Sequence, residues 1–456
     1  MRSRTPHSRK FLNYIGSNWA VGKQTLPRRS AVAPFAAKRR LAIAKAFKGN
    51  ILVFEAGNSK VRSNDTEYQY RPHSAFAHLT GWGAATVADS ILVIDARGQK
   101  PRSILFFRET AGRETKEFFA NASIGEFWVG VRPSLEKVAA LLGIETRSLS
   151  DYRAFIKTLP KAKITNLNAS KDLAQFASEL RLIKDSFEIS EMRKAVAASV
   201  RGFENAVKNL KSAVGHPRGE RVVETSFYAQ ARIEGNGLGY ETISASGAHA
   251  CTLHWIINDG PVKKGDLLLL DAGVEVESLY TADITRTIPV SGKFSDAQRK
   301  IYEAVREAAD AGFAVAKPGA KFRDVHEAAM KVIAKRTAEW GLLPVTAEES
   351  LQKENQFHRR WMVHGTSHHL GIDVHDCALA RREMYLDAVL KPGMVFTIEP
   401  GLYFQSDDLL VPKEFRGIGV RIEDDVLITK NGVENLSKAL PRKASDVEKW
   451  LAKLQR

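Results

Sequence analysis

Short apolar runs alternate with polar segments in the first part of the chain, beginning after residue 50. The runs are ILVFEAG (51–57), ADSILVIDARG (88–98) and RSILFFRE (102–109). Each run is bounded by Gly, Asn, Asp or Arg, which predicts buried strands of a mixed sheet. Helical stretches are predicted near 34–47, 110–120 and 135–142. The pattern therefore predicts an α/β domain over residues 31–175.

One polar and aromatic stretch interrupts this domain. Residues 64–82, NDTEYQYRPHSAFAHLTGW, are unusually rich in aromatic and polar side chains for a core segment. We interpret the stretch as a loop that faces a site.

The spacing of apolar residues becomes helical over 173–210, where neither Pro nor Gly occurs before Gly202. This predicts a connector that continues into the first long helix of a second domain. The domain boundary is expected within 164–182. The second domain is assigned to residues 176–456.

The second domain then alternates between strands and helices. DLLLLDAGVEVESLYTADITRTIPVSG (266–292) predicts two strands around a turn near 275–278. Ser295 and Gln298 form the S-x-x-Q pattern of a capping box, which starts a helix that ends near Ala316. Further predicted elements are a helix over 322–340 and strands within 392–404 and 419–429.

The composition indicates a basic N-terminal segment and a cellular compartment for the protein. The net charge is +16, and no acidic residue precedes Glu55. Residues 1–30 are interpreted as a solvated basic arm; a transit peptide or a nucleic-acid-binding arm is the alternative. No membrane span is expected, because no run of eighteen apolar residues occurs. Cys251 and Cys377 are the only cysteines, which excludes a disulfide framework and favours a cytoplasmic location.

Four acids stand inside otherwise apolar, strand-like runs. They are Asp271, Asp283, Glu399 and Glu423. A buried carboxylate is unfavourable unless it is paired or binds a metal. Asp271 and Asp283 are separated by an even number of residues across the predicted hairpin, so both can project from the same face.

A histidine-rich stretch supplies nitrogen ligands. VHGTSHHLGIDVHD (363–376) holds four histidines in fourteen residues, and His368 is the candidate ligand. Any one of these residues alone is more often structural, but the set together favours a site. Four carboxylates and one imidazole suit two divalent ions that share bridging ligands. The residues therefore predict a dinuclear hydrolase whose substrate they leave open.

The same five positions, in order and with their flanking residues, carry a family resemblance. LLDAG, TADITRT, HGTSHHLGIDVHD, TIEPGLY and VRIEDDV resemble the pita-bread metallopeptidases, the superfamily of methionine aminopeptidase, prolidase and aminopeptidase P. The stretch at 64–82 resembles the N-terminal domain shared by prolidases and aminopeptidases P. His364 and Ser367 in VHGTSHHLG favour the aminopeptidase P form. The resemblance implies an α/β N-terminal domain followed by an α+β pita-bread catalytic domain.

The resemblance also implies roles for individual residues. The implied metal ligands are Asp271, Asp283, His368, Glu399 and Glu423. The implied catalytic residues are Glu399 as general base, with His254, His364 and His375 around the scissile bond. The implied substrate-binding residues are His364, His375 and Arg421, of which His364 and Arg421 line the site for proline. His369 is placed in the neighbourhood of the site without a chemical role.

An Xaa-Pro aminopeptidase is thus the expected function. The cofactor expected is two divalent ions, preferably Mn²⁺, with Co²⁺, Zn²⁺ or Fe²⁺ as alternatives. The expected partners are X-Pro peptides and further copies of the chain in a homodimer or homotetramer, with neither membrane nor nucleic acid. The alternatives are an Xaa-Pro dipeptidase and a non-catalytic pita-bread protein that binds nucleic acid or another protein.

Overall fold

The computed structural model describes residues 6, 8–20, 25–64 and 66–455. The chain forms two compact units, Met1–Ala177 and Ser178–Arg456. We treat each unit by itself. Among the described helices, none combines the length and the hydrophobicity that a membrane span requires.

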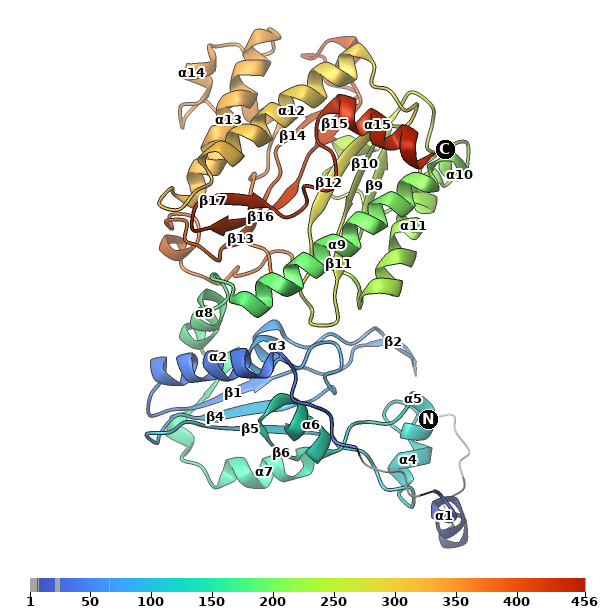
Figure 1. Cartoon of the computed structure of the whole chain (residues 1–456), viewed down its shortest axis with the longest axis vertical. Helices are drawn as coiled ribbons and strands as arrows, with labels where there is room; N and C mark the ends of the chain where they lie inside the picture. The colour runs from blue at the N-terminus through green and yellow to red at the C-terminus, as the bar shows by residue number, and fades with distance from the viewer. Residues whose placement is uncertain (1–5, 7, 21–24, 65, 456) are drawn as a thin grey trace. The chain divides into compact units, whose positions relative to one another are not determined.

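The first unit is built on a five-stranded sheet in the order β6-β5-β4-β1-β7 (Figure 1). Its strands are β1 (Ile51–Glu55), β4 (Ile91–Asp95), β5 (Arg102–Phe107), β6 (Glu145–Ser148) and β7 (Ile164–Asn166). β4 pairs antiparallel with β1 and β5, whereas β7 and β6 pair parallel with β1 and β5. The predicted mixed sheet is confirmed.

Helices cover this sheet on both faces (Figure 1). They are α2 (Ala33–Ala46), α3 (Ser74–Thr80), α6 (Leu135–Leu142) and α7 (Leu149–Lys157), with the short α4 (Lys116–Ala120) and α5 (Glu126–Val129) and the hairpin β2 (Val61–Ser63) and β3 (Thr66–Glu67) beside them. Ile51 and Val53 lie in the core that packs against Phe155 and Ile156 of α7. The alternate residues of β1 are also buried, so the strand is covered on both sides as its apolar run predicts.

Two predictions for this unit are wrong in part. The segment 64–82 is not one loop, because it contains α3, all of whose residues are buried. The guanidinium groups of Arg39 and Arg40 on α2 donate to the carbonyls of His78 and Leu79 at the end of α3, so two of the early basic residues serve the core. The helix predicted over 110–120 forms only over α4, where Thr115 caps its first turn.

The described part of the basic N-terminus packs against α4. Helix α1 (Arg9–Gly16) places Phe11 against Phe119, with ring centroids 5.3 Å apart. Trp19 lies 6.1 Å from Phe118, and the Arg113 guanidinium lies 4.2 Å from the Trp19 ring. Residues 1–5, 7 and 21–24 of the predicted arm lie outside the described residues.

The second unit contains long helices and several small antiparallel sheets. The helices are α8 (Lys171–Glu179), which begins before the boundary, α9 (Ser186–Lys208), α10 (Leu210–Ala213), α11 (Gly219–Glu234), α12 (Asp296–Val315), α13 (Phe322–Glu339), α14 (Ala347–Ser350) and α15 (Ala444–Leu454). The strands are β8 (Gly237–Leu238), β9 (Ile243–Ser246), β10 (Leu267–Ala272), β11 (Val274–Glu275), β12 (Ile284–Pro289), β13 (Val395–Ile398), β14 (Gly401–Phe404), β15 (Ile418–Arg421), β16 (Asp424–Thr429) and β17 (Gly432–Asn435). The sheet orders are β12-β10-β9, β13-β16-β17, β14-β15 and β11-β8.

The predicted boundaries of these helices are close to those observed. Ser295 and Gln298 form the predicted capping box of α12, and α13 covers the predicted 322–340. The stretch of helical spacing over 173–210 holds most of α8, a break at 180–185 and the long helix α9, which starts at a new cap. This arrangement agrees with the predicted connector that continues into a long helix. Asp185 accepts hydrogen bonds from the first turn of α9, and Glu188 completes a second capping box.

The segment between α8 and α9 anchors a loop of the site. Asp376, at 1% exposure, pairs with Arg181 Nε at 2.9 Å and with Lys184 Nζ at 3.1 Å. Burial alone raises the pKa of Asp376, but the charges of Arg181 and Lys184 bring it below its ordinary value. The carboxylate thus fixes the loop that carries His375 to the start of the second unit.

Replacement of Asp376 by asparagine is expected to remove about 3–5 kcal/mol of the free energy of unfolding, because it removes the carboxylate that pairs with the buried Lys184 and leaves Arg181 with its pair to Asp373 at 3.3 Å. The folded-state pKa lies below that of the unfolded chain, so this contribution is fully present above about pH 4 and is lost as pH falls through the folded-state pKa. Urea denaturation should show the loss near pH 7 and a smaller difference at acid pH. Asp407→Asn, at an exposed position in a turn, is the control and should change stability by less than about 0.5 kcal/mol. An Asp376→Asn protein as stable as the wild type near pH 7 would contradict this account.

Candidate metal centre and active site

One cavity of about 520 Å³ in the second unit gathers the predicted site residues. The predicted side chains that line it are His254, Asp271, Asp283, His364, His368, His375, Glu399, Arg421 and Glu423. These residues span about 170 positions of the chain, from His254 to Glu423. The fold brings all nine together.

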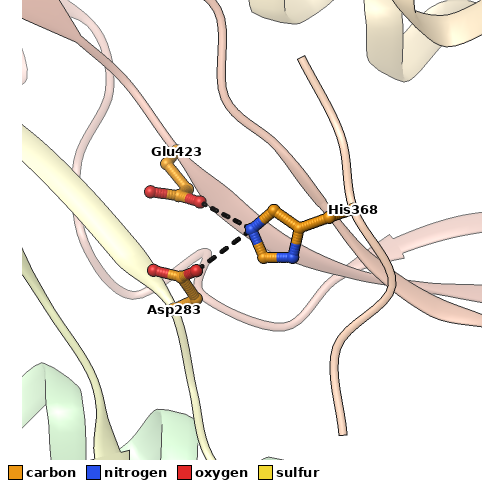
Figure 2. Close-up of side chains that lie close together, drawn as sticks. All are labelled: Asp283, His368 and Glu423. Carbon is orange, nitrogen blue, oxygen red and sulfur yellow. Dashed lines mark ion pairs between the residues drawn. The ribbon is translucent and has the colours of Figure 1, made fainter. Parts of the chain in front are cut away.

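Three of the predicted ligands form a tight cluster (Figure 2). Asp283, His368 and Glu423 each offer one ligand atom, and these atoms all lie within 4.8 Å of one another. His368 Nε2 lies 3.2 Å from Asp283 Oδ2 and 4.0 Å from Glu423 Oε1. Asp283 directly precedes β12, His368 lies in the loop before β13, and Glu423 joins β15 to β16.

The other two carboxylates lie beside this cluster. Glu399 Oε1 is 3.5 Å from His368 Nε2. The Tyr240 hydroxyl faces Asp271 Oδ1 at 2.7 Å and Asp283 Oδ1 at 2.5 Å. Asp271 pairs with Thr285 across β10 and β12, so Asp283, two residues earlier, projects from the same face. The prediction of a shared face is confirmed.

Burial and mutual repulsion act on these acids. Glu399 has its pKa raised to about 7, chiefly by burial and then by the charges of Asp283 and Asp271, against the opposing charge of His368. Burial and the charge of Asp283 also raise the pKa of Glu423 well above its ordinary value. Such a set cannot hold all its negative charge without cations.

His368 partly balances the carboxylates. The hydrogen bond with Asp283 and the charge of Glu399 raise the pKa of His368 to about 9, although burial opposes the shift. The cluster is thus oxygen-rich, converges on one cavity and carries excess negative charge. Oxygen ligands with a single imidazole are the donor set for divalent ions such as Mn²⁺, so the residues fit a metal centre.

Arg421 is tied into the cluster. Its Nη2 donates to Asp271 Oδ2, its Nη1 donates to the Tyr403 hydroxyl at 3.0 Å, and its Nε donates to Thr285 Oγ1 at 3.1 Å. The Thr285 hydroxyl in turn donates to Glu423 Oε2 at 2.7 Å. Arg421 therefore lines the cavity and fixes two of its carboxylates.

The predicted histidines surround the carboxylates. His364 Nε2 lies 2.8 Å from the Tyr403 hydroxyl, and burial with the charge of Arg421 lowers the pKa of His364 to about 3. The His375 ring lies 4.4 Å from the His368 ring. Burial and the charge of His368 lower the pKa of His375. His364 and His375 are therefore neutral hydrogen-bonding groups near pH 7.

His369 does not line the cavity. It is fully buried, and its ring stacks on Phe322 with centroids 4.8 Å apart and an interplanar angle of 12°. Its place in the neighbourhood of the site, without direct contact with the cavity, agrees with the prediction.

The sequence did not predict several residues that support the site. They are Tyr240, Thr285, Thr397, Tyr403 and Asp425. Thr285 and Asp425 lie two residues after a predicted ligand on the same strand face, a pattern that could have suggested them. Tyr240 and Tyr403 carry no such local signal, because only the tertiary fold brings Tyr240 to Asp271 and Asp283 and Tyr403 to Arg421 and His364.

Comparison with known proteins supports this site. The model for "Metallopeptidase family M24" matches residues 190–430, and that for "Aminopeptidase P, N-terminal domain" matches residues 36–167. The chain belongs to metallopeptidase family M24, in its aminopeptidase P branch. Xaa-Pro aminopeptidase 1 of Streptomyces coelicolor is 48% identical over 441 residues, covering 93% of this chain and 88% of that protein.

Solved M24 structures share the fold. The Pseudomonas aeruginosa aminopeptidase PepP matches with a TM-score of 0.81 and 29% identity, over 93% of this chain and 99% of that one. Escherichia coli aminopeptidase P with the inhibitor Pro-Leu matches with a TM-score of 0.81 and 28% identity, over 93% and 99%. The predicted family, pita-bread fold and assignment as a metal-dependent aminopeptidase are confirmed. Family membership implies a dinuclear metal site.

Replacing Tyr240 by phenylalanine is expected to weaken divalent metal binding about 10- to 100-fold, because Asp271 and Asp283 lose the hydroxyl that orients them. Calorimetric titration of the metal-stripped protein with Mn²⁺ measures the effect. Tyr302→Phe, which removes a buried hydroxyl bonded to the Arg442 carbonyl, is the control and should leave metal affinity unchanged. Equal affinities for wild type and Tyr240→Phe would exclude this role.

Proposed function

We propose that this aminopeptidase releases the N-terminal residue from peptides with proline in second position, as an Xaa-Pro aminopeptidase with two bound Mn²⁺ ions. The observation that carries the proposal is the convergence of five ligand positions and three further histidines on one cavity. Relatives at 48% and 47% identity that bear the name Xaa-Pro aminopeptidase support it.

Five side chains would hold the ions. Asp271 would bind one ion, His368 and Glu399 the other, and Asp283 and Glu423 would bridge them. When bound, such ions polarise a carbonyl group and lower the pKa of a coordinated water. Tyr240, Thr285 and Arg421 orient the carboxylates through the hydrogen bonds described above.

Glu399 is the proposed general base and proton carrier. Its Oε1 faces His368, and its Oε2 lies 3.7 Å from His364 Nδ1. The proton that Glu399 takes up would be delivered to the proline nitrogen as the amide bond breaks, which regenerates the carboxylate. Both nitrogens of His364 have other partners, since Nδ1 lies 2.7 Å from the Gly365 carbonyl oxygen and Nε2 lies 2.8 Å from the Tyr403 hydroxyl. A positioned carboxylate of this kind contributes about 10²–10⁴-fold to rate.

The histidines would recognise the peptide. A neutral His375 would donate a hydrogen bond to the scissile carbonyl oxygen, where negative charge develops during the reaction. His254, on the loop between β9 and β10, would face the substrate near the scissile bond. His364 and Arg421 would border the subsite for the proline ring.

The substrate preference has a physical basis. The bond before proline is a tertiary amide without an N–H group, and its ring fixes the backbone torsion. A peptidase that relies on that N–H as a recognition group fails on such a bond. A site that recognises ring shape and a free N-terminus can accept it instead.

Finer features of the enzyme belong to the same proposal. Mn²⁺ is preferred over Co²⁺, Zn²⁺ and Fe²⁺ because the ligands are mostly oxygen. A homodimer or homotetramer and a cytoplasmic location are proposed, the latter because both cysteines are unpaired. We also propose the division into residues 1–30, 31–175 and 176–456; the two compact units and the two family matches support the second boundary.

Peptide hydrolysis tests the activity. Metal-stripped protein should regain cleavage of the tripeptide Arg-Pro-Pro at its first bond when Mn²⁺ is added, and Gly-Pro should be a poorer substrate. Product release is followed by liquid chromatography. Cleavage confined to the dipeptide would identify a dipeptidase instead, and cleavage of neither peptide would reject the proposal.

Variants of the site residues separate the roles. Asp283→Asn should abolish activity together with metal binding. His375→Ala should keep its metal and lose about 10²–10³-fold in kcat, the usual effect of removing one donor to a developing oxyanion. Metal content is measured by atomic emission spectrometry alongside steady-state kinetics. A His375→Ala enzyme with wild-type kcat would exclude the role given to that histidine.

A further inference from the structure

The loop that presents His254 to the cavity has little regular structure. It runs from the end of β9 at Ser246 to the start of β10 at Leu267, with a short 3-10 turn over Gly247–Cys251. His254 is exposed on this loop. Among the residues that the structure describes, no hydrogen bond to its imidazole is present. The position of the His254 imidazole therefore depends on the contacts that hold the loop.

A single buried carboxyl group holds the loop. Glu220, in the first turn of α11, is 0% exposed. Its Oε1 accepts from Ser246 N and from His249 Nδ1, both at 2.8 Å. Its Oε2 accepts from Trp255 Nε1 at 2.9 Å and from Gly260 N at 2.7 Å. The four donors span the loop from 246 to 260.

The contact nearest to the site is the indole of Trp255, the residue that follows His254. Its ring also stacks on His249, with centroids 3.9 Å apart and an interplanar angle of 26°. Indole N–H and imidazole both point to Glu220, so the two rings are fixed as one unit. Because the peptide bond between residues 254 and 255 is rigid, fixing Trp255 limits where His254 can lie.

The end of the loop closes tightly on the same carboxyl group. Glu220 N donates to the Gly260 carbonyl at 3.1 Å, which completes a reciprocal pair with the Gly260 N–H. A Cβ at position 260 would lie 2.6 Å from His249 Cε1 and 2.8 Å from Glu220 Oε2. Only glycine fits there without displacing these groups.

The arrangement is unusual for a purely structural contact. Within the described residues, Glu220 pairs with neither lysine nor arginine, although a buried carboxylate without such a partner is unfavourable. Four donors from one loop offset this cost, since an ionised carboxylate has acceptor capacity for each of them. Three of the four donors come from the loop that carries His254, and the fourth, Ser246 N–H, lies at the end of β9 where this loop begins.

We propose that Glu220 is a positioning residue for His254. It acts through Trp255 and the ends of the 246–260 loop and does not line the cavity. The inference rests on the proposed role of His254 in the peptidase reaction. It adds a residue outside the lining of the cavity that controls the geometry of the site.

Glu220→Gln is the first test. The amide keeps one acceptor oxygen but turns its NH₂ group toward two loop donors, so the loop should shift. We expect kcat for the X-Pro tripeptide to fall about 10- to 100-fold, since displacement by about 1 Å costs up to about 10²-fold. KM should change less than kcat, and the bound metal should equal that of the wild type. Unchanged kcat would overturn the proposal.

A double-mutant cycle separates positioning from general stability. In a His254→Ala background, Glu220→Gln should have no further effect on kcat, because the group that it positions is gone. The same fold-loss in both backgrounds would show that Glu220 serves only the fold. A wild-type kcat for the His254→Ala variant would refute the proposed role of His254 in the reaction. This single variant therefore separates a failure of the proposed function from a failure of the positioning role of Glu220.

Two further variants separate the effect of unfolding from the effect of lost positioning. Trp255→Phe removes the indole N–H and leaves a smaller ring to stack on His249, and it should give a smaller loss of kcat that also vanishes in the His254→Ala background. Leu451→Ala, at a fully buried position on α15, serves as the destabilised control. It should lower the melting temperature without lowering kcat. If Trp255→Phe keeps wild-type kcat while Glu220→Gln fails to fold, the proposal is wrong.

Discussion

The structure of the second unit depends on the burial of like charges. Asp271, Asp283, Glu399 and Glu423 are brought into one cavity, where burial and mutual repulsion raise the pKa of Asp271, Glu399 and Glu423. Burial also acts on Asp283, but its contact with His368 brings its pKa below the ordinary value. Folding alone gives no reason to gather such groups, because each would be more favourable in water. Bound divalent cations resolve the conflict, so the site is intelligible as a metal centre.

Hydrogen bonds and ion pairs from several elements stabilise these buried acids. Tyr240 bridges two of the acids, Thr285 binds a third, and Arg421 neutralises Asp271. The fully buried Arg286 of β12 also pairs with Asp424 of β16, in a different sheet, at 2.7 Å. The loops that carry His254 and His375 are each held from outside the cavity, one by Glu220 and the other by Asp376. The cavity-lining groups are thus supported by several separate sets of polar contacts.

Sequence patterns predicted the strands beside the ligands, since each acid interrupts an apolar run, and the even spacing of Asp271 and Asp283 predicted their common face. Asp271 lies within β10, whereas Asp283, Glu399 and Glu423 lie at strand ends and not inside the strands that the apolar runs predicted. The family motifs named the remaining site residues. The motifs could not reveal Tyr240 or Glu220, because the partners of their side chains lie far away in the sequence. The nearest acid that the Tyr240 hydroxyl contacts is 31 positions away, and the nearest donor to the Glu220 carboxylate is 26 positions away. Segment 64–82 was misjudged because the aromatic and polar composition of a loop also suits the buried helix α3, whose terminal carbonyls are satisfied by arginines from a distant helix.

The most direct test of this account counts the cations that the acid cluster holds. Calorimetric titration of the metal-stripped wild-type protein with Mn²⁺, paired with thermal unfolding, should show two ions bound per chain and a melting temperature that rises with free Mn²⁺, because the ions bind the folded state. Binding of a single ion, of none, or of two ions without any gain in stability would contradict the claim that the cluster is built for a dinuclear centre.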